Sequence, residues 1–292
     1  MEQVGYSVGL YAKVRNIDTK KAYQELLARK CFSINRMPVE ISPINILLDV
    51  EIRDKIYRDF LSMLRLEKQH KNRLRNMGFL DSSIEENLYR SVPKNRIKRR
   101  LIGNSLSKKY NLAGLPGFYQ EEDFCWYFSR IDGFFVPVYD SNGYIQGLSI
   151  HLDKPFNNTS DMWFSSSNKI NGTSAKNWIM RYNITKSSTK VFLTDNFLLG
   201  NLIKEIINAP TIAFQNISNS YSVLKEIDGT NIEDITFVLK IPETNQNLDY
   251  IINRIFRDLL PLGYNLDIKY IRDYKDFFEK DFDVIDILKK TA

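Results

Sequence analysis

The sequence predicts an α/β fold, α+β overall, with an N-terminal helical region, a central part rich in β-hairpins, and a C-terminal parallel sheet with flanking helices. Three patterns predict it: helical spacing of apolar residues early in the chain, a hairpin signal near its middle, and alternating short strands and helices after Lys190. With 292 residues, 43% of them apolar and 13% aromatic, the chain can bury a substantial core.

The N-terminal residues predict two short helices over residues 5–30, the second of them capped by Asp18 or Thr19. Two short helices have too little apolar surface to form a core alone. The following stretch, RMPVEISPIN, contains two prolines and is typical of a linker. We therefore expect a separate N-terminal segment over residues 1–43.

Two amphipathic helices and a third, capped one are predicted next. The first carries apolar residues at three- and four-residue spacing: Ile52, Ile56, Phe60, Met63 and Leu64. The second places His70 on its apolar face, where packing or hydrogen bonding is its expected role, and ends at Gly78. The stretch Ser82–Glu85 has capping-box spacing. This arrangement fits either a DNA-reading helix-turn-helix or an ordinary helical hairpin.

The middle of the chain is rich in β-forming residues. Phe134–Tyr139 and Tyr144–Leu152 are predicted strands, joined by a turn over Asp140–Gly143, and Met162–Ser166 is a further strand candidate. Together with the basic helices, this part is predicted to cover residues 44–185.

The C-terminal part, residues 186–292, alternates between strands and helices. Predicted strands are Val191–Thr194, Thr211–Phe214, Ile235–Leu239 and Leu266–Ile271, and a helix is predicted over Leu248–Leu262 with Gly263 closing it. In parallel sheets, ligands gather at the carboxyl ends of the strands. Asp195 follows the first of these strands and is therefore a candidate metal ligand.

Positive charge is concentrated in one region of the chain. The net charge is +6, yet residues 53–109 carry 16 Lys and Arg against 6 Asp and Glu, so the rest of the chain is net negative. Such a region favours a polyanionic partner, although a solvated helical face gives the same pattern. The candidate phosphate contacts are Lys94, Arg96, Lys98, Arg99, Arg100, Lys108 and Lys109. Tyr89 and Tyr110 flank them as candidate stacking surfaces.

Composition excludes several other classes of site and protein. Two cysteines, Cys31 and Cys125, and two histidines, His70 and His151, are too few for a zinc ribbon or a disulfide framework, and we expect the cysteines to be buried. Apolar runs are too short to span a membrane, and the N-terminus has no export signal pattern. We expect a cytoplasmic protein without zinc.

Several phrases in the sequence resemble a known family. IYRDFLSMLRLEKQHKNRLRNMGF, YRSVP, LAGLPGFY and GFFVPVYDSNGYIQGLSIHLD occur in the order found in primase-like replication proteins of bacterial mobile genetic elements. FSSSNKINGT and the C-terminal alternation extend the resemblance over nearly the whole chain. In that family a zinc ribbon precedes a toprim-type domain. The ribbon is missing here, although GLYAKVRNIDTKKAYQELL resembles the helical tail that follows it.

The resemblance implies a Mg²⁺ site made by a Glu after the first toprim strand and an Asp-x-Asp after a later one. This chain has Asp195 at the first position and Lys240, Ile241 and Pro242 at the second. A cation repels a metal ion, and Lys240 is instead a candidate ion-pair partner of Asp195. The acids nearest to such a site are Asp195, Glu243, Asp281 and Asp283, of which the last two resemble the family's C-terminal acidic ending.

Three functions remain open from the sequence. The first is a primase-like, non-catalytic DNA-replication protein of a mobile element, which binds single- or double-stranded DNA or RNA, or replication proteins of the same element. The second is an active toprim nucleotidyltransferase that uses Mg²⁺. The third is an interaction or regulatory protein that does not bind nucleic acid. We expect no cofactor for the first and third, and no membrane partner for any of them.

Overall fold

The chain forms two compact units, Met1–Ser42 and Pro43–Ala292. The computed structural model describes residues 15–18, 21, 47–156, 159–215, 220–240, 257–271 and 274. In the first unit the backbone N–H of Lys21 donates to Asp18 Oδ1 at 3.0 Å, so Asp18 is the helix cap there. The predicted linker lies outside the described residues. Within the described residues, no helix has the length and apolarity that crossing a bilayer requires.

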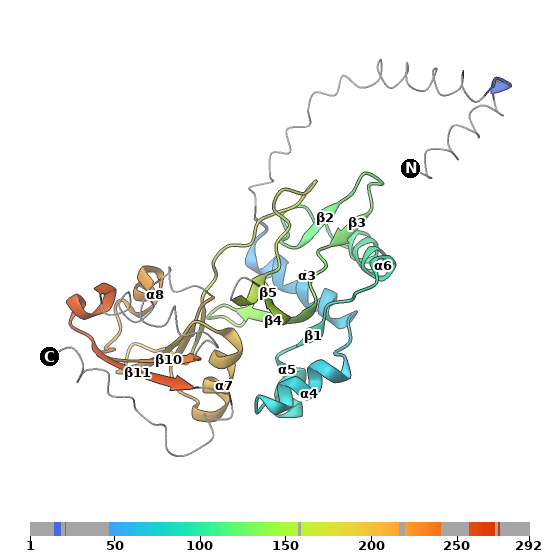
Figure 1. The fold of residues 1–292 in the computed structure, drawn as a ribbon. Helices are drawn as coiled ribbons and strands as arrows, with labels where there is room; N and C mark the ends of the chain where they lie inside the picture. Colours follow the sequence, from blue (N-terminus) through green and yellow to red (C-terminus); the bar gives the residue numbers. More distant parts are fainter. Residues whose placement is uncertain are drawn as a thin grey trace. The chain divides into compact units, whose positions relative to one another are not determined.

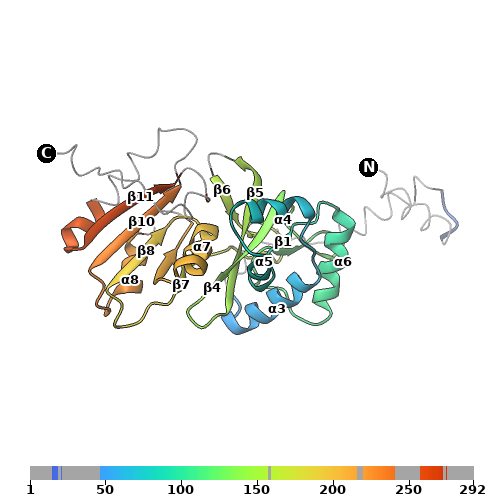
Figure 2. The ribbon, with the colours of Figure 1, turned by 90° about the horizontal axis from the view of Figure 1, so that it is seen from below.

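Four helices lie in the part of the chain before β4 (Gly133–Tyr139), beside the central sheet (Figure 2). They are α3 (Val50–Ser62), α4 (Lys68–Asn76), α5 (Asp81–Glu86) and α6 (Arg96–Ser107). The first two confirm the predicted amphipathic helices, since α3 buries Ile56 and Phe60, and α4 buries His70 and Leu74. Ile52, predicted on the apolar face of the first helix, is exposed instead. The predicted cap of α5 is wrong: the helix begins at Asp81 without a side-chain cap, so Ser82 lies inside its first turn.

The central sheet is antiparallel, with the strand order β1-β4-β5-β6. Its strands are β1 (Arg90–Ser91), β4 (Gly133–Tyr139), β5 (Ile145–Phe156) and β6 (Thr159–Trp163). The predicted hairpin is confirmed, because Asp140–Gly143 joins β4 to β5 and Gly143 takes the positive φ of 81° that its turn requires. A separate two-stranded hairpin pairs β2 (Phe118–Gln120) with β3 (Trp126–Phe128).

The C-terminal sheet has the order β11-β10-β8-β9-β7 and is parallel except at β7 (Figure 2). Its strands are β7 (Met180–Tyr182), β8 (Lys190–Thr194), β9 (Thr211–Ala213), β10 (Asp234–Lys240) and β11 (Asn265–Ile271). Helices α7 (Phe197–Ile207) and α8 (Ser220–Ile227) and the short helix η3 (Leu260–Leu262) lie between them. The mainly parallel sheet is therefore confirmed, while most of the helix predicted over residues 248–262 lies outside the described residues.

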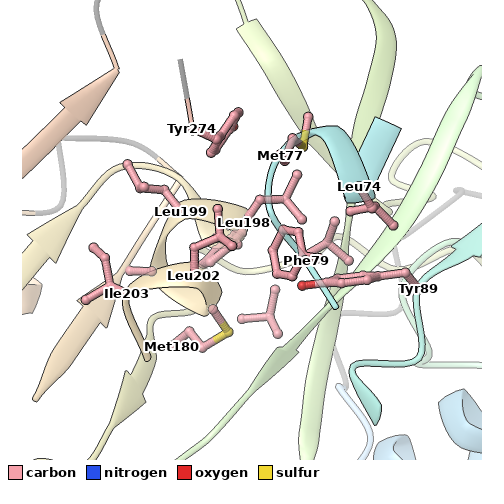
Figure 3. Packing of buried hydrophobic residues seen from close by; sticks show 14 of the residues in the cluster. Leu74, Met77, Phe79, Tyr89, Met180, Leu198, Leu199, Leu202, Ile203 and Tyr274 are labelled. Atoms are coloured by element: carbon pink, nitrogen blue, oxygen red, sulfur yellow. The ribbon is translucent and has the colours of Figure 1, made fainter. Parts of the chain in front are cut away.

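One hydrophobic core joins the central and C-terminal sheets through α7. Figure 3 shows Leu198 and Leu202 of α7 between Met180 and the side chains of Phe79 and Tyr89. Strand β4 supplies every second residue to this core, namely Phe134, Val136 and Val138. Since side chains alternate across a strand, the intervening residue Phe135 packs in a second core on the other face. Both faces of β4 are therefore buried, which explains its continuous apolar run.

The second core is organised around Phe60 of α3. Its ring centroid lies 5.0 Å from that of Phe118, 4.9 Å from Phe128 and 5.3 Å from Phe135, all in edge-to-face geometry. Phe164 stacks on the same ring at 5.9 Å. This aromatic cluster fixes α3, the β2–β3 hairpin and the central sheet to one another.

Replacing Phe60 with Ala should lower the free energy of unfolding by about 3–5 kcal/mol, because the cavity removes contacts to four aromatic rings. Urea denaturation measures this change. Ile52→Ala, at an exposed position of the same helix, is the matched control and should change stability by less than about 0.5 kcal/mol. Equal effects of the two substitutions would contradict the assigned core.

Candidate functional site

The carboxyl end of β8 has one acid and a helix cap. β8 ends at Thr194, and Asn196 caps α7 by accepting a hydrogen bond at Oδ1 from the backbone N–H of Leu199, at 2.9 Å. Asp195 lies between them, partly buried. The expected ion pair with Lys240 is wrong: Lys240 Nζ lies 4.9 Å from the ring centroid of Tyr274, and within the described part of the chain no cation pairs with Asp195.

The environment of Asp195 disfavours its ionised form. Burial raises the pKa of this carboxyl to about 6, and the negative charge of Asp161 acts in the same direction. A metal ion or a basic partner would have the opposite effect. Asp195 therefore has a carboxylate without a charge partner among the described residues.

A chain of hydrogen bonds connects α4 to α7 through the central sheet. Arg73 NH2 lies 2.7 Å from His151 Nε2, and His151 Nδ1 lies 2.9 Å from Asp161 Oδ1. A guanidinium only donates, so Nε2 must accept and the ring proton is on Nδ1, donated to Asp161. Asp161 Oδ2 then accepts from Asn196 Nδ2 at 3.0 Å. We call Arg73, His151, Asp161 and Asn196 the polar chain.

The second histidine is hydrogen-bonded in a similar way next to this chain. His70 Nε2 donates to Asp153 Oδ1 at 2.7 Å, and Nδ1 lies 2.7 Å from Ser91 Oγ. Ser91 Oγ also accepts from the backbone N–H of Glu67 at 2.7 Å. The expectation that His70 is packed and hydrogen-bonded is confirmed.

The described residues do not fit the divalent cation that the resemblance implies. Hard cations take several carboxylate or carbonyl oxygens. Asp195 is the acid at the end of β8, the end of β10 carries Lys240, and Asp161 uses both carboxylate oxygens to accept from Asn196, His151 and Ser160. In the described ranges no three His, Cys, Asp or Glu side chains converge on a metal site. The candidate ligands Glu243, Asp281 and Asp283 lie outside the described residues.

The seven cations predicted to contact phosphate are not all exposed. Arg99 is buried and donates to the carbonyl oxygens of Pro93 and Lys94 at 3.0 and 2.7 Å, so its guanidinium is not available to a phosphate. Burial also lowers the pKa of Arg99. This side chain holds the start of α6 in place.

Three other cations of the seven already have acidic partners. Arg96 pairs with Glu121, Arg100 NH1 lies 3.9 Å from Asp123 Oδ2, and Lys109 Nζ lies 3.5 Å from Asp59 Oδ2. In contrast, Lys94, Lys98 and Lys108 are exposed, and within the described residues none of them has an acidic partner. Of the seven predicted cations, these three lysines are therefore free to bind an anion.

The two tyrosines predicted as stacking surfaces differ in exposure. Tyr89 is fully buried, and its hydroxyl accepts a hydrogen bond from Asn201 Nδ2 at 2.7 Å, so the prediction that it stacks on a base is wrong. Tyr110 is partly exposed, and its hydroxyl donates to Asp59 at 2.7 Å. Cys125 is a free thiol that is partly rather than fully buried, while Cys31 lies outside the described residues.

Lys94 lies in an open pocket of about 570 Å³ at the ends of β4 and β5. The lining residues are Lys94, Arg130, Ile131, Asp132, Leu152, Asp153, Lys154, Phe156 and Met162. Three of them are cations, and Arg130 lies 3.6 Å from Asp132. Lys94 and Lys154 have no acidic partner within the described residues, and Phe156 is 61% exposed. We call this site the basic pocket.

Known structures share this arrangement of sheets and helices. The zinc-binding and RNA polymerase domains of Aquifex aeolicus primase match with a TM-score of 0.57 and 9% identity, over 93% of this chain and 66% of that one. The fold is primase-like. The RNA polymerase domain of Mycobacterium tuberculosis primase DnaG matches this chain with a TM-score of 0.54 and 10% identity, over 78% of this chain and 79% of that one.

A DNA primase domain from Pseudomonas aeruginosa gives a TM-score of 0.52 and 13% identity, over 77% and 73% of the two chains. The match to the A. aeolicus structure spans just under two thirds of that chain. No protein-family model and no curated protein matches the sequence. The primase-like fold is thus shared at an identity too low to transfer an activity.

Sequence reasoning missed most of the residues that this structure brings together. Arg73 and Lys94 are far from Lys154, Phe156 and Asp161 along the chain, so no short motif links the two groups. The one usable signal for the basic pocket is the pattern Lys-Pro-Phe at the end of a predicted strand, where an apolar ring follows the buried part of the sheet. Lys94 is the residue of the predicted set that lies in the pocket.

Asp195→Asn should stabilise the protein at pH 7 by about 1–3 kcal/mol, since one pKa unit corresponds to about 1.4 kcal/mol. The folded chain binds the Asp195 proton more tightly than the unfolded chain does, so wild-type stability falls as the pH rises from about 4 to 6. The gain should therefore vanish below about pH 4. Urea denaturation at both pH values measures it. A loss of stability at pH 7 would contradict the assigned environment.

Proposed function

We propose that this chain binds single-stranded nucleic acid through the basic pocket and acts in DNA replication without catalysing nucleotidyl transfer. The observation that carries the proposal is the combination of two unpaired lysines, Lys94 and Lys154, with the exposed ring of Phe156 in one open pocket. Cations attract the phosphate backbone, and an exposed ring offers a surface on which a base can stack.

A single strand suits the basic pocket better than a duplex. Bases that stack on an aromatic side chain must first be unpaired, which a single strand allows without disrupting a helix. The apolar residues Ile131, Leu152 and Met162 line the pocket and suit a base face, while the lysines suit the phosphates on either side of it. Asp132 Oδ1 faces Arg130 and Asp153 Oδ1 accepts from His70, so the Oδ2 atoms of the two carboxylates remain as acceptors for base amino groups.

The primase-like fold supports a nucleic-acid partner. The M. tuberculosis DnaG RNA polymerase domain has been solved in complex with a double-stranded DNA oligomer carrying a 6-nucleotide overhang. Together with the sequence resemblance to replication proteins, this favours DNA replication as the process, and the resemblance alone suggests that the DNA belongs to a mobile genetic element. Replication proteins of that element are its proposed partners.

The non-catalytic part of the proposal rests on the described metal-site residues. One carboxylate, Asp195, lies at the end of β8, a lysine stands at the end of β10, and Asp161 is occupied by the polar chain. This set lacks the oxygen ligands that a Mg²⁺ site needs.

Lys94→Ala/Lys154→Ala should weaken binding of a fluorescent oligo(dT), and the slope of log K against log salt should become shallower by about 1.4, or about 0.7 per lost phosphate contact. Fluorescence anisotropy across a salt series measures both. Phe156→Ala should cost about 1–3 kcal/mol of binding free energy through lost stacking.

The matched control is Lys176→Ala/Lys186→Ala, which removes two exposed lysines outside the pocket. Its affinity and salt slope should equal those of the wild type. If both double variants lose the same affinity, binding is a property of net charge alone and the pocket assignment fails.

No oligonucleotide should form when the protein is incubated with single-stranded template, nucleoside triphosphates and Mg²⁺ or Mn²⁺, and DNA affinity should not change on adding EDTA. Denaturing gels and the anisotropy assay test these two outcomes. Product formation that Asp195→Asn abolishes would establish the catalytic alternative instead.

A further inference from the structure

The solvent-facing side of α6 carries an apolar pair that no element among the described residues covers. Ile97 and Leu101 are one helical turn apart and are 69% and 65% exposed. Ser105 and Lys108 continue the same stripe and are also exposed. The opposite side of α6 is buried through Ile102 and its neighbours, and it packs on β3 and α3. We call Ile97, Leu101, Ser105 and Lys108 the α6 face.

The tip of the β2–β3 hairpin adds a third exposed apolar residue next to this face. Phe124 is 83% exposed and has a φ of +58°, which is a strained conformation for a bulky side chain. Local hydrogen bonds hold it: its N–H donates to Glu121 O at 2.9 Å, and its carbonyl accepts from Gln120 Nε2 at 3.0 Å. The backbone is thus held in a costly conformation that leaves an aromatic ring in solvent.

Two ion pairs fix the hairpin tip to α6. Arg96 pairs with Glu121, and Arg100 lies 3.9 Å from Asp123. Arg96 and Arg100 lie along the edge of α6 that faces β3, with which the helix packs side by side (Figure 1). Phe124 therefore flanks the α6 face on one side, and exposed apolar residues occur together there rather than singly.

The α6 face is also positively charged. Lys98 and Lys108 have no acidic partner within the described residues, while Glu121 and Asp123 of the hairpin are paired with Arg96 and Arg100, and Glu122 is exposed. An apolar stripe at helical spacing, flanked by unpaired lysines, matches a second helix that carries apolar residues on one side and acids beside them.

We propose that the α6 face docks an acidic amphipathic helix of a partner protein. Nucleic acid fits this face less well than it fits the basic pocket, because the stripe itself has no aromatic side chain and Phe124 lies only at its edge. The two nearest arginines are also already paired. A second copy of the chain would bring lysines against lysines. The surface does not include the basic pocket, so the proposal does not depend on nucleic-acid binding.

The test uses the full chain and a fluorescein-labelled synthetic peptide of three heptads, with Leu at a and d and Glu and Ala elsewhere. Fluorescence anisotropy should give saturable binding that weakens with salt, and the same peptide with Lys in place of Glu should not bind. Ile97→Gln/Leu101→Gln should weaken binding at least tenfold. Gln is a good helix former, so α6 should persist, and thermal unfolding verifies this.

The matched control is Leu80→Gln, because Leu80 is 69% exposed and lies outside the α6 face. It should bind the acidic peptide as the wild type does. Oligo(dT) affinity of Ile97→Gln/Leu101→Gln should also remain at the wild-type value, which separates this surface from the basic pocket.

Three outcomes would overturn the proposal. In the first, Ile97→Gln/Leu101→Gln binds the acidic peptide as tightly as the wild type. In the second, the variant loses oligo(dT) affinity in parallel, which would assign the α6 face to nucleic acid. In the third, light scattering detects a wild-type dimer that the variant dissolves, which would assign the face to a second copy of the chain.

Discussion

The packing of α7 between the two sheets is the contact on which the rest of this fold depends. Leu198, Leu199 and Leu202 lie in a single core with residues of α4, the α5 region and β4. Strand β4 is buried on both faces, so its other side packs in the core that contains Phe60. The same strand therefore contacts both cores. The polar chain is placed relative to this apolar framework, and burial of apolar surface is the dominant favourable term in folding.

The polar chain crosses the same junction as the α7 core. It begins at Arg73 on α4, passes through His151 and Asp161 of the central sheet, and ends at Asn196, the residue that caps α7. Buried polar groups are tolerable where each has a hydrogen-bond partner. Here the guanidinium bonds to the imidazole, the imidazole to the carboxylate, and the carboxylate to the amide. Among the described residues, the hydrogen bond between Asp161 and Asn196 therefore connects the central sheet to the carboxyl edge of β8.

The basic stretch shows why charge count and binding surface differ. Arg53 is buried over the ring of Trp178 at 5.1 Å, Arg99 is buried against backbone carbonyls, and Arg73 belongs to the polar chain. A long guanidinium can satisfy several buried acceptors, so positive residues serve the interior as well as the surface. Several lysines remain for partners. Lys94 lies with Phe156 in the basic pocket, and Lys98 and Lys108 lie beside the exposed side chains of Ile97 and Leu101.

The sequence by itself determined the elements whose signal is local. The spacing of Ile56 and Phe60, the turn at Asp140–Gly143 and the alternation after Lys190 depend on neighbours within one helix, hairpin or strand, and each is confirmed. The start of α5 was not determined, since Ser82 has the right spacing for a cap but lies within the helix.

Only the tertiary structure decided which side chains meet. Asp161 and Asn196 are 35 residues apart, and Arg73 and His151 are 78 apart, so no pattern in the chain predicts their contact. The same holds for the basic pocket, where Lys94 joins Lys154 and Phe156 from another element. Burial likewise separates Arg99 from Lys98, although they are adjacent in sequence, because one helical step turns a side chain by about 100° from the solvent towards the core.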